Sequence, residues 1–261
     1  MTVKRTFVAT ALLAASLVGC TTNPVSGRKQ MVLVSEEQAQ ASSTQAYAKT
    51  LSEAQQKGDL STNAALNNRV KRITDRLIAE AKLMYPPSRD WKWSVAVIDQ
   101  PTLNAWCMPG GKMAIYTGVI QKLNLSDDEI AQIMAHEIAH ALLGHGRERM
   151  SHAIAMQGGL ALGSILAGQD LSVLAPVAEV AITLPNSREG ESEADRYGVE
   201  LAARAGYDPH AAVKLWEKMS AASGNGPPQF LSTHPSPDNR IVALNALVPK
   251  MMPIYEKARQ Q

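Results

Sequence analysis

Hydrophobic and polar positions follow two different periods after residue 34. Over about 64–84, apolar side chains recur every three to four residues, which predicts an amphipathic helix. Ser35 and Gln38 resemble a capping box and predict another helix over roughly 36–57, rich in Ala, Gln and Glu. Helical spacing therefore dominates the first part of the pattern.

Strand spacing is restricted to a short central part of the chain. Over 91–97, large apolar residues alternate with polar or small ones, and a Gly110-Gly111 turn precedes a second expected strand at 112–117. Most of the remaining sequence has helical character, with neither an internal repeat nor a clear domain boundary. The pattern predicts one α+β domain over 35–261, mainly α-helical, with a small β-sheet.

The first twenty residues have the pattern of a bacterial lipoprotein signal. Two basic residues precede an uncharged apolar stretch at 7–18 that is too short to span a bilayer, as in a secretory signal peptide. Leu-Val-Gly-Cys resembles the lipobox, which implies a signal peptide at 1–19 and lipidation of Cys20. We expect 20–34 to be a lipidated N-terminus and tether. Thr21 follows where Asp would retain an inner-membrane lipoprotein, so the periplasmic face of a Gram-negative outer membrane is expected.

Charge and cysteine content narrow the range of partners. The chain has 26 Lys and Arg against 24 Asp and Glu, and loss of 1–19 would leave 24 against 24. This balance gives no reason to expect nucleic acid as a partner, so membrane attachment would come from lipid. With Cys20 acylated, Cys107 would be the single cysteine left, which excludes an intramolecular disulfide.

A metal-site motif lies at 136–140 within an expected helix that a capping-box pattern opens at Ser126. His136 and His140 are four residues apart, so both imidazoles lie on one helix face and can bind the same ion. Glu137 beside them can accept a proton from water that the ion activates. The pattern predicts hydrolytic chemistry with one Zn²⁺ per chain.

A catalytic zinc site needs a third protein ligand. The candidates are His145, His152, His234 and the acids at 189–195. His145 stands nine residues after His136, about 180° round a continuous helix, so it should face away from the metal and have a structural or surface role. The metzincin spacing is absent, because its third histidine position holds Gly146.

The acidic stretch at 189–195 is the better source of that ligand, on a helix that Asn186 or Ser187 can cap. Two pairs of carboxylates stand four residues apart there: Glu191 with Asp195, and Glu189 with Glu193. One carboxylate can bind zinc while another accepts the second imidazole N–H of a ligand histidine. Spacing alone leaves the three glutamates as alternatives.

Three segments together resemble the M48 metallopeptidases: HEIAH at 136–140, SREGESEAD at 187–195, and STHPSPDNRI at 232–241. The resemblance covers about 23–247 and is greatest to the periplasmic lipoprotein and Oma1-like branch. It implies a zincin-type (gluzincin) metalloprotease domain with its small β-sheet beside the HExxH helix. It also implies that Glu191 is the third zinc ligand and that Asp195 contacts the ligand residues without binding the metal itself. Cys107 departs from the small or aliphatic residue usual in the family.

Two further residues enter the expected site through this resemblance. His234 precedes Pro235 in a Gly-, Pro- and Ser-rich stretch, 223–237, which we expect to be a loop. In related proteins this histidine can approach the zinc, so it is a candidate latch or a stabiliser of the tetrahedral intermediate. Arg240 is a weaker electrostatic candidate.

Substrate is expected to extend along the strand near 112–117 and to add main-chain hydrogen bonds at a sheet edge. The candidate residues are Asn104, Gly111, Lys112, Met113 and Ala114. The uncharged stretch at 153–169 is expected to form a buried or lid-forming helical hairpin, with a membrane-contacting hairpin as the alternative.

The function predicted from these features is a membrane-anchored zinc endopeptidase for misfolded or unassembled cell-envelope proteins. One alternative is a latched, protease-like chaperone or assembly factor for outer-membrane proteins with little proteolytic activity. Another is a zinc hydrolase that acts on a different amide.

Overall fold

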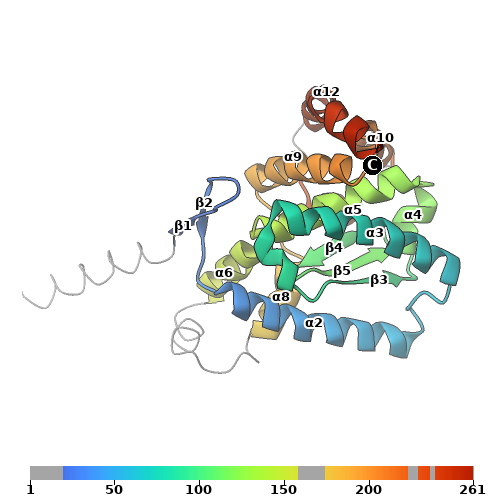
Figure 1. The fold of residues 1–261 in the computed structure, drawn as a ribbon. Helices are drawn as coiled ribbons and strands as arrows, with labels where there is room; N and C mark the ends of the chain where they lie inside the picture. The colour runs from blue at the N-terminus through green and yellow to red at the C-terminus, as the bar shows by residue number, and fades with distance from the viewer. Residues whose placement is uncertain (1–19, 158–173, 223–228, 236–238, 261) are drawn as a thin grey trace, which may run out of the picture.

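The computed structural model describes residues 20–157, 174–222, 229–235 and 239–260. This part of the chain is mostly helical with two small sheets, which confirms the α+β class (Figure 1). The expected signal peptide at 1–19 and most of the 153–169 stretch lie outside the described residues. Within them, none of the helices combines the length and apolar character needed to cross a bilayer.

The elements follow one another in an order that places the sheet strands between two sets of helices. In chain order they are β1 (Cys20–Thr22), β2 (Lys29–Met31), α2 (Glu36–Lys57), α3 (Ala64–Met84), η1 (Pro86–Asp90), β3 (Ser94–Ile98), β4 (Ala105–Met108), β5 (Lys112–Tyr116), α4 (Thr117–Lys122), α5 (Asp127–Leu142), α6 (His145–Gln157), α8 (Leu174–Ala181), α9 (Arg188–Arg204), α10 (His210–Ala221), α11 (Gln229–Thr233) and α12 (Arg240–Ala258).

Local sequence signals account for the helix boundaries. Ser35 caps α2 with both hydrogen bonds of the expected capping box, and Asn63 caps α3 through Leu66 N–H. Gly58 ends α2 in the left-handed conformation that glycine adopts without steric cost. The predicted helices at 36–57 and 64–84 are thereby confirmed.

The main sheet has three strands in the order β3-β5-β4. β5 pairs in parallel with β3 and antiparallel with β4. The strand at 112–117 is therefore central, and the expectation that it offers a sheet edge to substrate is wrong. The missed strand β4 lies at one edge of the sheet and β3 lies at the other; the four residues of β4 are all buried.

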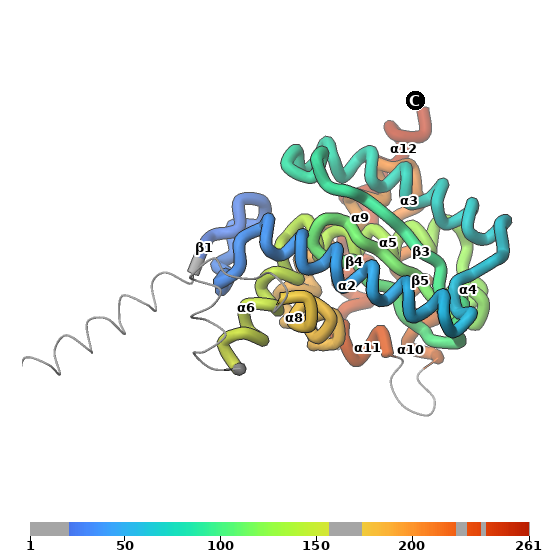
Figure 2. Tube along the Cα trace, turned by 90° about the horizontal axis from the view of Figure 1, so that it is seen from below, coloured from blue at the N-terminus to red at the C-terminus, as the bar shows by residue number. Residues whose placement is uncertain are grey.

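Both faces of this sheet are covered, which explains why β4 lacks an alternating polarity. Ala105 and Cys107 belong to a core cluster with residues of α3 and α5, whereas Trp106 and Met108 belong to a second cluster with α2, α6 and α8. Figures 1 and 2 show α2 on one side of the strands and α3 with α5 on the other. A strand covered on both faces is a continuous apolar run, so its sequence has no period of two.

Residues 20–34 differ from the expected tether. β1 and β2 pair antiparallel, and the hairpin packs against the body of the protein. Asn23 and Gln30 each donate a side-chain hydrogen bond to Leu143 O, at 2.6 and 2.9 Å. The polar side chains of this segment, which suggest a linker in the sequence, therefore form hydrogen bonds to the backbone at the end of α5.

The close approach of α9 to α5 brings the two motif-bearing helices together. A Cβ added at Gly198 would lie 2.9 Å from the backbone nitrogen and Cα of His136, a separation that real side chains do not adopt. Gly198 is therefore the residue that lets α9 lie directly against α5 at the level of the histidine motif.

Candidate metal centre and active site

Helix α5 presents the two motif histidines to one another. Ser126 and Glu129 form the expected capping box, and the acidic first turn complements the helix dipole. One turn apart, His136 and His140 bring their Nε2 atoms to 3.0 Å. Both rings are buried, so these two nitrogens converge within the protein and not at its surface.

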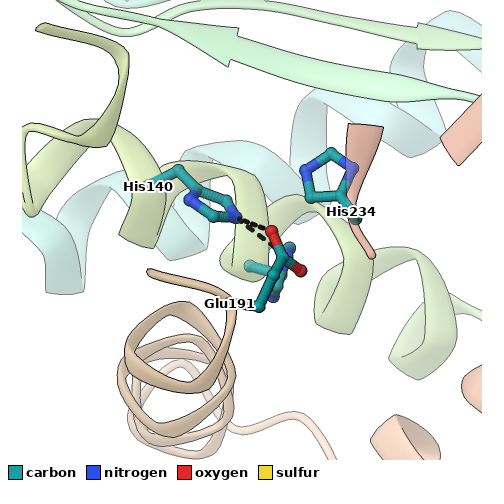
Figure 3. A group of neighbouring side chains, drawn as sticks. His140, Glu191 and His234 are labelled. Atoms are coloured by element: carbon teal, nitrogen blue, oxygen red, sulfur yellow. Dashed lines mark hydrogen bonds and ion pairs between the residues drawn. The ribbon is translucent and has the colours of Figure 1, made fainter. Parts of the chain in front are cut away.

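Helix α9 supplies the carboxylate that completes this group. Ser187 caps the helix through Gly190 N–H, and Glu191 follows in the first turn. Its Oε1 lies 3.2 Å from His140 Nε2, and its Oε2 lies 3.4 Å from His136 Nε2. Figure 3 shows Glu191 pointing at His140 from the neighbouring helix. Of the three glutamates that spacing left open, Glu191 is the one that meets both histidines; Glu189 is exposed.

Two further charged residues, Asp195 and Arg240, contact these ligand residues. Asp195 Oδ1 lies 3.1 Å from His136 Nδ1, where it accepts the second ring N–H of that histidine. Arg240 donates to Glu191 Oε2 at 2.8 Å and to Asp195 Oδ1 at 2.5 Å, and its guanidinium lies 3.4 Å from the ring centre of Trp216. Arg240 therefore holds the carboxylates in place, and its two terminal nitrogens are engaged with them.

His234 enters the site from a part of the chain that differs from the expected loop. Residues 229–233 form helix α11, and His234 N–H continues it by donating to Phe230 O at 2.8 Å. The His234 ring stacks on Phe230, and its Nδ1 lies 3.1 Å from Phe230 O, an atom that can only accept a hydrogen bond. Because Nδ1 is then the donor, Nε2 carries the lone pair. Burial lowers the pKa of His234 to about 3, so the ring is neutral at physiological pH.

The lone pair of His234 faces the same group. Its Nε2 lies 3.2 Å from Glu137 Oε1. One ligand atom each from His136, His140, Glu191 and His234 lie within 4.8 Å of one another. Figure 3 shows three of these residues, His140, Glu191 and His234. Residues 236–238 lie outside the described residues, and α12 begins at Arg240.

A divalent cation fits this arrangement. Among the described residues, Glu191 Oε1 is buried and accepts no hydrogen bond, although His140 Nε2 is 3.2 Å away. Acceptor atoms that converge in this way repel one another unless a proton or a metal cation lies between them. Two imidazole nitrogens and one carboxylate oxygen are the donor set of catalytic zinc sites.

Glu137 is placed to exchange protons beside this group. It is buried, and burial raises the pKa of its carboxyl to about 8 against the opposing effect of His136. Its Oε1 has no hydrogen-bond partner in the described part of the chain. A carboxylate with a raised pKa can take a proton from water and release it again near neutral pH.

His145 does not face away from the metal group, contrary to the expectation from helical spacing. Helix α5 ends at Leu142, and Gly144 turns the chain with a φ of 68°, so α6 begins in a new direction at His145. The ring returns to the site, and its Nδ1 lies 2.7 Å from His140 Nδ1. The expected direction was therefore wrong, and His145 is buried and not at the surface.

The expected substrate residues lie at two different places. Asn104 lines the pocket that contains Glu137 and His234, together with Ala105, Trp106 and Cys107 of β4. Gly111, Lys112, Met113 and Ala114 lie instead in the turn before β5 and within that central strand. Arg149, which sequence analysis did not single out, also lines the pocket.

Comparison with known proteins agrees with this geometry. The model of peptidase family M48 matches residues 64–248. Human mitochondrial metalloendopeptidase OMA1 is 32% identical over 249 residues, which cover 90% of this chain and 47% of the human protein. Mitochondrial metalloendopeptidase OMA1 of Schizosaccharomyces pombe is 34% identical over 87% of this chain and 66% of its own. The beta-barrel assembly-enhancing protease of Escherichia coli is 28% identical over 71% of this chain and 39% of its own. The chain thus spans about half the length of its human relative.

Proposed function

Since this chain belongs to peptidase family M48, we propose that it is a zinc-dependent endopeptidase that hydrolyses peptide bonds in unfolded proteins. The observation that carries the proposal is the buried convergence of His136, His140 and Glu191 beside the carboxyl of Glu137. These three residues would hold one Zn²⁺. When bound, the ion supplies Lewis-acid chemistry, which lowers the pKa of water and polarises a carbonyl oxygen.

Side chains of the protein transfer the protons and position the ligand residues. Glu137 takes a proton from the attacking water and passes it to the leaving amine nitrogen, so each peptide bond consumes one water. Asp195 fixes the tautomer of His136 by accepting its Nδ1–H, and Arg240 holds Asp195 and Glu191 in place through its two ion pairs.

The free edge of β4 is the proposed substrate strand. Tyr116 N–H donates to Asn104 O, so the alternation of an antiparallel pair turns the backbone groups of Ala105 and Cys107 away from β5. Both residues line the same pocket as Glu137, where Ala105 N–H donates to Asn104 Oδ1 at 3.0 Å, so a substrate strand would replace that bond. An extended peptide could pair with them through its own main chain, a mode that favours unfolded substrates of varied sequence.

The proposed location is the periplasmic face of the outer membrane, with a lipid anchor at Cys20 and envelope proteins as substrates. The lipobox-like ending at Cys20 supports the anchor. Similarity to a protein named beta-barrel assembly-enhancing protease supports envelope proteins as the substrate class.

A second candidate function is a latched assembly factor with little proteolytic activity. The observation that favours it is the position of His234, whose Nε2 lies 3.2 Å from Glu137 Oε1 and within the metal-ligand group. A ring in that position would occupy the place of the attacking water, and it would have to move before a peptide could reach Glu137.

Cleavage of unfolded casein by the full-length protein separates these functions. The endopeptidase proposal expects cleavage by the parent and by a Glu189→Gln control, since Glu189 is exposed, and none by Glu137→Gln. A latch expects a higher rate from His234→Ala than from the parent. Little cleavage by the parent, a higher rate from His234→Ala, and equal rescue of an envelope defect by the parent and Glu137→Gln would support the latched assembly factor. No cleavage by any variant, His234→Ala included, would contradict both the peptidase and the latch. Mass spectrometry of proteins trapped by Glu137→Gln would identify the substrates.

A further inference from the structure

A chain of polar side chains runs from His140 to the N-terminal hairpin. His140 Nδ1 lies 2.7 Å from His145 Nδ1, and His145 Nε2 lies 3.0 Å from Glu193 Oε2. Glu193 also accepts a hydrogen bond from Arg28 Nε at 2.8 Å. His145 is 3% exposed, so bulk water does not substitute for these contacts.

Metal binding would fix which atom is the donor and which is the acceptor in each of these hydrogen bonds. If His140 Nε2 is the ligand atom, its neutral ring carries a proton on Nδ1 and donates it to His145 Nδ1. The proton of His145 then lies on Nε2 and is donated to Glu193, which can only accept. Each donor meets one acceptor, with a carboxylate at the end.

The two ligand histidines therefore have equivalent support by different routes. His136 donates directly to a carboxylate, that of Asp195. Among the described residues, the partner of His140 Nδ1 is the ring of His145 and not a carboxylate, and His145 in turn contacts Glu193. This makes His145 part of the metal site without being a ligand.

The hairpin formed by β1 and β2 contacts Glu193, the last residue in this series of hydrogen bonds. Arg28 bridges Glu193 and Glu148, and its two Nη atoms lie 3.0 and 2.5 Å from the Glu148 carboxylate. Asn23 and Gln30 anchor the same hairpin to Leu143 O, two residues before His145. The hairpin thus contacts both the corner that places His145 and the carboxylate that orients it.

We propose that His145 is a positioning residue that sets the tautomer and ring orientation of His140 for metal binding, and that Arg28 of the N-terminal hairpin supports it through Glu193. The inference rests on the proposed metal site but not on peptidase activity. It gives the segment next to the predicted lipid anchor a role in metal affinity.

The test is Zn²⁺ affinity of the full-length protein, measured by competition with a chromophoric chelator. His145→Leu removes the acceptor for His140 and should weaken Zn²⁺ binding by about 10–100-fold, the usual effect of losing such a partner. His145→Asn keeps an acceptor oxygen near the position of Nδ1 and should recover most of that loss. Glu193→Gln and Arg28→Met should give smaller losses in the same direction.

Matched controls come from the same elements. Glu189 lies one turn before Glu193 on α9 and is exposed, and Lys29 follows Arg28 and is also exposed. Glu189→Gln and Lys29→Met should leave Zn²⁺ affinity within about twofold of the parent. The Co²⁺ absorption spectrum supplies a signature of ligand geometry, which should change in His145→Leu and not in the controls.

The outcomes separate this inference from the proposed function. A parent that binds no Zn²⁺ would contradict the metal site itself. A parent that binds Zn²⁺ while His145→Leu binds it equally well would overturn only the positioning role, even if His145→Leu lowers the Tm of the metal-free protein. Equal losses in His145→Leu and His145→Asn would overturn it too, because the acceptor would then not matter. Should His145→Leu fail to fold, Glu193→Gln carries the same test.

Discussion

Replacement of Arg240 by Met should destabilise the metal-free protein strongly. The guanidinium is 2% exposed and donates to Glu191 at 2.8 Å and to Asp195 at 2.5 Å. Met fills a similar volume but leaves two buried carboxylates without their cation. Removal of one partner from a buried ion pair costs about 3–5 kcal/mol, because the remaining charge is desolvated and uncompensated.

For a protein of this size that loss corresponds to a fall in Tm of roughly 6–20 °C. Zinc would restore part of it, since a cation at Glu191 replaces some of the lost compensation. The double variant Arg240→Met with Asp195→Asn should also recover stability, because it removes one of the two orphaned charges. Thermal unfolding followed by circular dichroism, with and without Zn²⁺, measures all three effects.

Arg204 provides the matched control, since it forms an exposed ion pair with Glu200 on α9. Arg204→Met should cost no more than about 1 kcal/mol, as exposed pairs do. If Arg240→Met shifted the Tm by no more than Arg204→Met, the role of Arg240 in holding the carboxylates would be refuted.

Three further predictions test other parts of the structure. Gly198→Val should cost about 1–3 kcal/mol by forcing α9 from α5, which an unchanged denaturant midpoint would contradict. Burial raises the pKa of the Cys107 thiol well above its usual value, so iodoacetamide at pH 8 should label Cys107 only after unfolding, and rapid labelling of the native protein would argue against a buried β4. Burial raises the pKa of Glu193, but hydrogen bonds led by that from His145 outweigh this and hold it at about 2. The ionised Glu193 carboxylate therefore stabilises the fold at pH values above 4.5, its pKa in the unfolded chain. This stabilisation is lost as the pH falls toward 2. The Tm of the parent should fall more between pH 6 and pH 3 than that of Glu193→Gln; equal falls would contradict the coupling.

Features of the site that depend on spacing within one helix could be predicted from the sequence. A separation of four residues places His136 and His140 on one face whatever surrounds α5, and the cap at Ser187 fixes where α9 begins. Which of Glu189, Glu191 and Glu193 is the third metal ligand could not be predicted in this way, because it depends on how α9 lies against α5. Spacing left that choice open, and only the family resemblance pointed to Glu191.

Features that depend on a change of chain direction could not be predicted. His145 appeared to face away because the helix was assumed to continue, whereas Gly144 turns the chain and returns the ring to His140. The edge strand β4 was missed because both its faces are buried and its polarity does not alternate. The docked hairpin at 20–31 depends on partners more than a hundred residues away, such as Leu143 and Glu193.

The proposed function requires cleavage of peptide bonds with one metal ion held by His136, His140 and Glu191, and with Glu137 as the base. The most direct test titrates Zn²⁺ into the metal-free protein while casein cleavage and bound zinc are measured together. We expect no cleavage without metal, a rise that saturates at one Zn²⁺ per chain, and a Glu137→Gln variant that binds the same zinc and cleaves nothing. Cleavage that persists without metal, or equal cleavage by Glu137→Gln, would contradict it.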